Sequence, residues 1–203
     1  MSDKQHIQGG QCSSLFFNSA VAHRRFFFTV IILLVFTMDV YGGDVDISIV
    51  KEDSGFKINA TFSTPVQADK VREVLVDYEN IPNFVSAIVK SKIKNRENGV
   101  ILLEQVGLQK ILPLVSIKIS LLLRVEENNN RINFEDISKK DFERYIGYWE
   151  INEVSSDTVV TYTLFIVNPK FYVPKFIAKE VFLDKSKKMC REILDEINRR
   201  SGG

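Results

Sequence analysis

The sequence predicts a single α+β domain in which a curved antiparallel sheet wraps around a long C-terminal helix, with two short helices after the first strand. Two observations support this prediction. Six segments with strand-like alternation follow one another between residues 87 and 167, and turn sequences such as RENG, ENNN and SSD separate them. Residues 174–199 instead repeat apolar side chains at helical spacing. Because consecutive antiparallel strands need a cover on one face, this helix is expected to supply it.

The elements before the six strands are expected in a fixed order. The segment GFKINATFST, residues 55–64, alternates apolar and polar residues and is predicted to be a strand. The preceding VDISIV is expected to pair with it across a short turn. In TPVQADKVREVLVDY the period changes, since Val71, Val74, Leu75 and Tyr78 recur at helical spacing after a proline.

The six later strands are expected at residues 87–95, 100–108, 114–126, 131–137, 142–153 and 158–167. In the third of them, Lys118, Ser120 and Arg124 alternate with apolar residues, so its apolar face is predicted to look inward. The final helix carries an apolar stripe that is expected to face the sheet: Ala178, Phe182, Met189, Ile193 and Ile197.

The first 42 residues have the pattern of a secretory signal peptide. Arg24 and Arg25 precede an apolar run at residues 26–38, and small residues follow near Gly42. We therefore expect residues 1–42 to be cleaved, residues 43–203 to form the domain, and the protein to be exported to the periplasm. A retained N-terminal membrane anchor is the alternative, although the run is shorter than the ~20 residues that span a bilayer. Translation from a start further downstream is a second alternative.

Charge and residue content exclude several functions. The chain has 27 Lys and Arg against 26 Asp and Glu, so no basic field favours nucleic acid. Cleavage would remove His6, His23 and Cys12, leaving Cys190 as the single cysteine of a chain without histidine. Histidine-dependent nucleophilic catalysis and a Cys/His zinc site would then be impossible. We expect no metal and no cofactor, and Cys190 is interpreted as a buried structural thiol.

Three motifs occur in a characteristic order: VLVDYENIPNFVSAIVKSKI from Val74, LEQVG from Leu103 and FERYIGYW from Phe142. Together they resemble the START-like polyketide cyclase/dehydrase and lipid-transport family, over residues 55–199. The resemblance implies a helix-grip fold, in which a curved sheet holds a long C-terminal helix around a hydrophobic tunnel. For function it implies less, because the family includes carriers, cyclases and proteins of other roles.

The first motif also has a physical interpretation. Pro82 disfavours helical geometry at Ile81, so the helix is expected to break there into two short helices that close one end of the fold. Phe84 is then free to fill the interior. Asp77 is expected to accept hydrogen bonds from backbone N–H groups at the start of the second helix.

The second motif contributes a candidate functional carboxylate. Glu104 shares strand parity with Val100, Leu102, Val106 and Leu108, which predicts that it faces inward among apolar side chains. A carboxylate there must be paired or protonated, and it would orient a ligand hydroxyl or act as an acid or base. The opposite strand parity, or a position at a wet rim, is the alternative.

Aromatic residues complete the expected ligand-binding set. Phe142 and Trp149 have opposite parity, and a bulge at Gly147 would bring both inward. Tyr145 and Tyr162 offer hydroxyl groups to a ligand's polar end, unless they only fill the core. The candidate ligand-binding residues are Phe84, Glu104, Tyr145, Trp149, Tyr162 and Phe182.

Aromatic and basic residues also alternate at the entry to the final helix, in NPKFYVPKFIAKEVF. Phe171, Tyr172 and Phe176 beside lysines favour transient contact with anionic lipid headgroups. An ordinary connection whose rings pack under it is the alternative.

Three functions remain open at this stage. The favoured one is an exported carrier or sensor that binds a lipid, isoprenoid or polyketide-like molecule in an internal cavity. The second is a cyclase-type or hydrolytic enzyme that uses Glu104 and tyrosines, although the missing histidine argues against it. The third is a protein-interaction module with a closed, filled interior.

Overall fold

The computed structural model describes residues 44–52, 55–112, 115–171 and 175–202. Within these ranges the chain forms eight strands, two helices and one 3₁₀ segment. Their bounds are β1 Asp46–Glu52, β2 Gly55–Thr64, α2 Ala68–Leu75, η1 Tyr78–Asn83, β3 Ile88–Glu97, β4 Val100–Leu112, β5 Val115–Glu127, β6 Arg131–Asp136, β7 Phe142–Val154, β8 Asp157–Pro169 and α3 Lys175–Ser201. The expected signal peptide lies outside the described residues.

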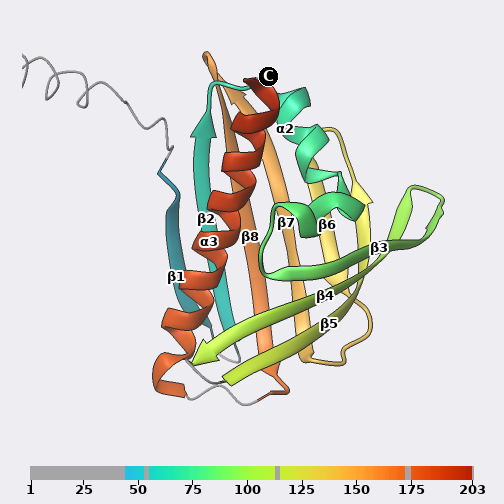
Figure 1. Ribbon diagram of the computed structural model, residues 1–203, viewed down its shortest axis with the longest axis vertical. Helices are drawn as coiled ribbons and strands as arrows, with labels where there is room; N and C mark the ends of the chain where they lie inside the picture. Colours follow the sequence, from blue (N-terminus) through green and yellow to red (C-terminus); the bar gives the residue numbers. More distant parts are fainter. Residues whose placement is uncertain (1–43, 53–54, 113–114, 172–174, 203) are drawn as a thin grey trace, which may run out of the picture. The chain divides into compact units, whose positions relative to one another are not determined.

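All eight strands belong to one antiparallel sheet in the order β1-β2-β8-β7-β6-β5-β4-β3. The predicted pairing of the first two strands is confirmed, with Asp46 opposite Thr61 and Glu52 opposite Gly55. Figure 1 shows α3 lying along β1 and β2, while β3, β4 and β5 at the other edge curl across toward it. The predicted α+β architecture is therefore confirmed, and the concave face of the sheet is turned toward α3.

The apolar stripe of α3 faces the sheet as expected. Ile197 is fully buried and Ile193 nearly so, and Ala178 is buried near the start of the helix. Cys190 is also fully buried, as expected, and is a free thiol among the described residues. No helix in the described part of the chain is long and apolar enough to cross a membrane.

The helix break differs from the prediction in its position. Helix α2 already ends at Leu75, and Pro82 lies inside η1 instead of ending a helix before it. A 3₁₀ segment tolerates the proline because its backbone φ angle matches the value that the proline ring fixes. The two short helices do exist, and they follow the second strand.

The expected role of Asp77 as a backbone cap is wrong. Its side chain makes no capping hydrogen bond to η1, although Asp77 is the residue before this segment. Instead, one carboxylate oxygen accepts a hydrogen bond from the side-chain amide of Asn80 at 2.8 Å. The other oxygen pairs with Arg200 of α3 at 2.8 Å, so the carboxylate serves a tertiary contact.

Candidate ligand-binding cavity

Two adjoining chambers lie between the concave face of the sheet and α3. The space open to the centre of a water-sized sphere is about 140 Å³ in one chamber and about 100 Å³ in the other. Both exceed by several-fold the roughly 10–15 Å³ that one water molecule needs on this measure. The chambers share the lining residues Ile88, Gln105, Tyr145, Tyr162 and Met189, so they meet at a common waist.

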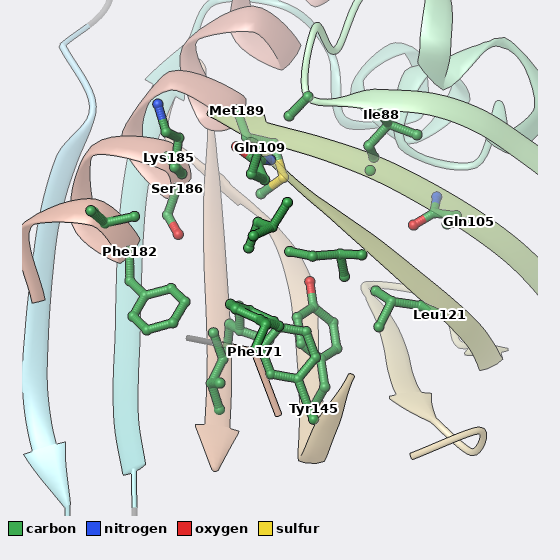
Figure 2. A pocket seen from close by; sticks show the side chains of 18 of the residues that line it. Ile88, Gln105, Gln109, Leu121, Tyr145, Phe171, Phe182, Lys185, Ser186 and Met189 are labelled. Atoms are coloured by element: carbon green, nitrogen blue, oxygen red, sulfur yellow. The ribbon is translucent and has the colours of Figure 1, made fainter. Parts of the chain in front are cut away.

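The larger chamber, here called the outer chamber, lies beside the first turns of α3 (Figure 2). The inward face of β5 contributes Ile117, Ile119 and Leu121, as the alternation of that strand predicted. The Phe171 ring meets the Phe142 ring edge-on with centroids 5.3 Å apart, and both line this chamber. Apolar side chains therefore make up most of its wall.

The smaller, inner chamber extends from the waist toward α2 and η1. Phe84, Trp149 and Phe134 line it, and the Trp149 ring lies 4.4 Å from the Tyr162 ring between centroids. Gly147 makes room for Phe134, since a Cβ atom at Gly147 would lie 2.6 Å from Cζ of that ring. Among the described residues, none of the side chains that line the inner chamber is charged.

Neutral polar groups gather at the waist. The Tyr145 and Tyr162 hydroxyls are hydrogen-bonded to each other, and burial raises the pKa of Tyr145 to about 12. Burial also raises the Tyr162 pKa well above its ordinary value. Gln105 donates from its amide nitrogen to the Ser91 hydroxyl at 3.2 Å. At neutral pH both tyrosines are therefore protonated, and the waist is polar without being charged.

The wall of the outer chamber also includes polar side chains from α3 and β4. Lys185, Ser186 and Gln109 are among its lining residues. The Lys185 ammonium lies 3.4 Å from Asp184, and in Figure 2 it points away from the ring cluster. The cation is thus partly exposed and locally paired, unlike the groups at the waist.

The inner end is closed by a hydrogen-bond network. The buried Tyr78 of η1 donates to Glu127 at 3.0 Å, and Arg72 of α2 lies 3.2 Å from the same carboxylate. Burial, followed by the nearby negative charge of Glu127, strongly raises the pKa of Tyr78. These contacts tie both short helices to the end of β5.

Five of the six ligand-binding residues expected from the sequence line these chambers. Phe84 and Trp149 face the inner chamber and Phe182 the outer one, while Tyr145 and Tyr162 border both. This placement is compatible with ligand contact, which stays a prediction.

The sixth residue, Glu104, lies on the opposite face of the sheet, so its expected inward orientation is wrong. Its carboxylate accepts a hydrogen bond from Lys90 at 2.6 Å, and this contact lowers the Glu104 pKa. The strand parity is the reverse of the expected one, since Ile101 and Leu103 are the buried residues of β4. Arg124 also faces outward, as expected, and lies near Glu126.

The inward polar residue of this motif is instead Gln105, which the sequence reasoning missed. It shares parity with Ile101 and Leu103, and both of those residues are buried. The two faces of β4 carry almost equally apolar residues, so alternation within this strand does not identify the inner face. Pairing with β5, whose inward face was predicted correctly, supplies the missing signal because Leu103 lies opposite Leu123.

The expected bulge at Gly147 is also absent. Strand β7 pairs with β8 in one unbroken register from Arg144 opposite Val167 to Val154 opposite Asp157. Phe142 nevertheless joins Tyr145 inside, with ring centroids 5.2 Å apart, because it occupies the first position of the strand. At the end of a strand, a side chain can turn inward without a change of register.

Of the aromatic residues at the entry to α3, Phe171 is half-buried in the wall of the outer chamber. Tyr172 and the side chain of Phe176 lie outside the described part of the structure.

In the residues that are described, no group of three or more His, Cys, Asp or Glu side chains could hold a metal ion. Burial raises the pKa of the Cys190 thiol to about 12, so it is not a thiolate at neutral pH.

Comparison with known proteins gives a family match. The model of the family described as polyketide cyclase/dehydrase and lipid transport matches residues 64–193. This range contains β3 to β8, both short helices and most of α3. No curated protein sequence matches the chain significantly.

Several solved structures have the same fold, although their sequence identity to this chain is low. A STAR-related lipid transfer protein from Xanthomonas axonopodis has 11% identity and a TM-score of 0.63, covering 80% of this chain and 97% of its own. The Zhui aromatase/cyclase from a Streptomyces species has 16% identity and a TM-score of 0.61, covering 77% and 96%. Human StAR-related lipid transfer protein 5 has 10% identity and a TM-score of 0.58, covering 90% and 99%. These likenesses confirm the helix-grip fold.

Proposed function

Because the chain belongs to the polyketide cyclase/dehydrase and lipid transport family, we propose that it is an exported carrier or sensor of a hydrophobic small molecule. The ligand, a lipid, an isoprenoid or a polyketide-like compound, would occupy the joined chambers. The observation that carries this proposal is the pair of apolar chambers between sheet and helix, which meet at one polar waist. Removal of the ligand's apolar surface from water would provide the binding free energy.

Catalysis is the less favoured alternative. Among the described residues, the lining of the two chambers contains no aspartate, glutamate or histidine. Tyr145 and Tyr162 are protonated at neutral pH, so they donate hydrogen bonds but do not act as bases. The geometry therefore supports binding and orientation more than proton transfer.

A closed interaction module is also less favoured, because the chambers are large relative to ordinary packing defects in a core. The waist groups offer a further argument. Gln105 and the two tyrosines place hydrogen-bonding atoms around empty space, which is typical of a ligand site.

We further propose that the end of the domain where α3 begins contacts a membrane surface while a ligand is exchanged. Phe171 and Phe182 line the outer chamber there, and Lys179 and Lys185 lie on the first turns of the helix. Apolar side chains beside lysines suit an anionic lipid surface. Sedimentation with vesicles of neutral or anionic phospholipid tests this contact, and equal lack of binding to both contradicts it.

The experiment that tests the main proposal is native mass spectrometry of protein purified from the exporting cell, followed by solvent extraction. We expect one apolar molecule per protein. Ala87→Phe, which enlarges a residue of the outer chamber, should reduce that occupancy. Val89→Phe is the matched control, because Val89 is half-exposed on the outer side of the same chain segment. Empty protein that also takes up no lipid from a panel would contradict the proposal.

A further inference from the structure

The polar atoms of the cavity are unevenly distributed. The residues shared by the two chambers include Gln105, Tyr145 and Tyr162, whose polar atoms border the waist. Ile88 and Met189 complete the shared lining with apolar atoms. On the inner side, Tyr78 has its hydroxyl engaged with Glu127. A ligand that reaches the inner chamber must therefore place an apolar part there, and a hydrogen-bonding group next to that part would find its partners at the waist.

The unused hydrogen-bonding capacity at the waist is of two kinds. The hydroxyls of Tyr145 and Tyr162 share one hydrogen bond, so one of their two O–H groups has no acceptor within the described structure. Gln105 donates from its nitrogen to Ser91, while no donor among the described residues reaches its carbonyl oxygen. One free donor and one free acceptor thus border the same space. A hydroxyl group satisfies both, since it accepts one hydrogen bond and donates another.

Charged ligand groups fit the waist poorly. A carboxylate or phosphate would lose its hydration there, and the nearest cation of the lining, Lys185, belongs to the outer chamber alone. That lysine is already close to Asp184. A ketone would accept from Tyr145 but would leave the Gln105 oxygen without a donor.

We propose that the cavity selects a molecule with a neutral hydroxyl group between two apolar parts, and that Tyr145 and Gln105 bind this hydroxyl at the waist. One apolar part fills the inner chamber beside Trp149, and the other extends into the outer chamber beside Phe182. This inference rests on the proposed function, because it names the class of ligand for the same cavity.

Trp149 supplies the readout for a test. It is the only tryptophan in the sequence and lines the inner chamber, so its fluorescence reports occupation of that space. The full chain is titrated with four compounds of equal carbon number: octadecane, stearyl alcohol, a secondary octadecanol with its hydroxyl at mid-chain, and the matching mid-chain ketone. The four probes share an apolar chain and differ only in the presence, position and type of the oxygen.

The mid-chain alcohol is expected to bind about five- to tenfold more tightly than octadecane or stearyl alcohol, with the ketone between them. Tyr145→Phe should remove most of this preference, because it lowers the affinity for the mid-chain alcohol much more than that for octadecane. Tyr148→Phe is the control, since it removes the same hydroxyl from the same strand, beneath Arg131 and outside the two chambers. Gln105→Met should lower the affinity for the alcohol more than that for the ketone.

The possible failures are distinguishable. Equal affinity of the wild-type protein for all four compounds overturns the hydroxyl selection and leaves the proposed function standing. A loss in Tyr145→Phe that is the same for octadecane and for the alcohol also overturns it, because the change would then be one of shape. Failure of every compound to change Trp149 fluorescence or to appear in native mass spectra overturns both proposals.

Discussion

Arg200, the penultimate residue of α3, lies 2.8 Å from the Asp77 carboxylate between α2 and η1. The same guanidinium is 2.7 Å from Glu196 and 5.5 Å from the centre of the Phe84 ring. Because Phe84 lines the inner chamber, one side chain connects the C-terminal helix, the helix break and the cavity wall. Asp77, an acidic residue of the first sequence motif, therefore has a structural role.

Neutralising this carboxylate should weaken the inner end of the domain. Asp77→Asn removes the charge that faces Arg200 while keeping the shape of the side chain, and both partners are only partly exposed. We expect the free energy of unfolding in urea to fall by about 1 kcal/mol. Glu153→Gln, at an exposed position of β7, is the control. A loss no larger than in this control would show that the pair does not stabilise the fold.

Glu196 should make the stability of the domain depend on pH in the acidic range. Hydrogen bonds from Arg199 to the Glu196 carboxylate lower its pKa, and Arg200 adds to this effect. Desolvation acts in the opposite direction, and the net result is a fall in the Glu196 pKa from 4.5 to about 2. Since the folded state holds this carboxylate ionised, its stabilising effect is complete above about pH 4.5 and is lost as the pH falls toward 2. The exposure of Arg199 screens the interaction, so we expect a loss of about 1 kcal/mol.

The comparison that isolates Glu196 is urea unfolding at pH 7 and at pH 3. The wild-type protein should lose more stability between these two values than Glu196→Gln, which has no charge to lose at this position. Parallel pH profiles of the two proteins would contradict the assignment.

Local patterns predicted the sheet and the long helix because alternation and helical spacing hold over many residues. Strand β5 is an example: its polar residues Lys118, Ser120 and Arg124 mark the outer face without ambiguity. Strand β4 lacks this contrast, so its alternation predicts Glu104 on the inner face, although the inward polar residue is its neighbour Gln105. The orientation of β4 becomes clear only from its pairing with β5, whose inner face is unambiguous.

The tertiary roles of polar residues were the harder part. Nothing local in the sequence indicates that Asp77 meets Arg200, because the two residues are far apart along the chain and meet only after α3 packs. The same is true of the waist, where Gln105 and Tyr145 come from separate strands. Residue type predicted aromatic and hydroxyl side chains in the cavity, whereas their grouping required the folded geometry.

Gly147 is expected to be intolerant of a side chain. A Cβ atom there would collide with the backbone carbonyl oxygen of Thr163 and lie 2.6 Å from the Phe134 ring. We expect Gly147→Ala to lower the free energy of unfolding by about 2 kcal/mol, as overpacked cores do. Because Phe134 lines the inner chamber, the emission of nearby Trp149 should shift as well. Gly202→Ala, with 3.5 Å to the closest atom, is the control, and equal stability of both variants would contradict the prediction.

Glu104 and Gln105 are neighbours that face opposite sides of β4, which permits a matched test of where the ligand binds. Glu104→Gln should leave ligand affinity and urea stability unchanged within error, because its partner Lys90 is half-exposed and both lie outside the chambers. Gln105→Leu should lower the affinity for a ligand with a hydrogen-bonding group about fivefold, since it removes an amide from the waist. Native mass spectrometry of both variants with one fluorescent lipid measures the difference. If Glu104→Gln weakened binding and Gln105→Leu did not, the ligand would have to occupy the outer face of the sheet instead of the chambers.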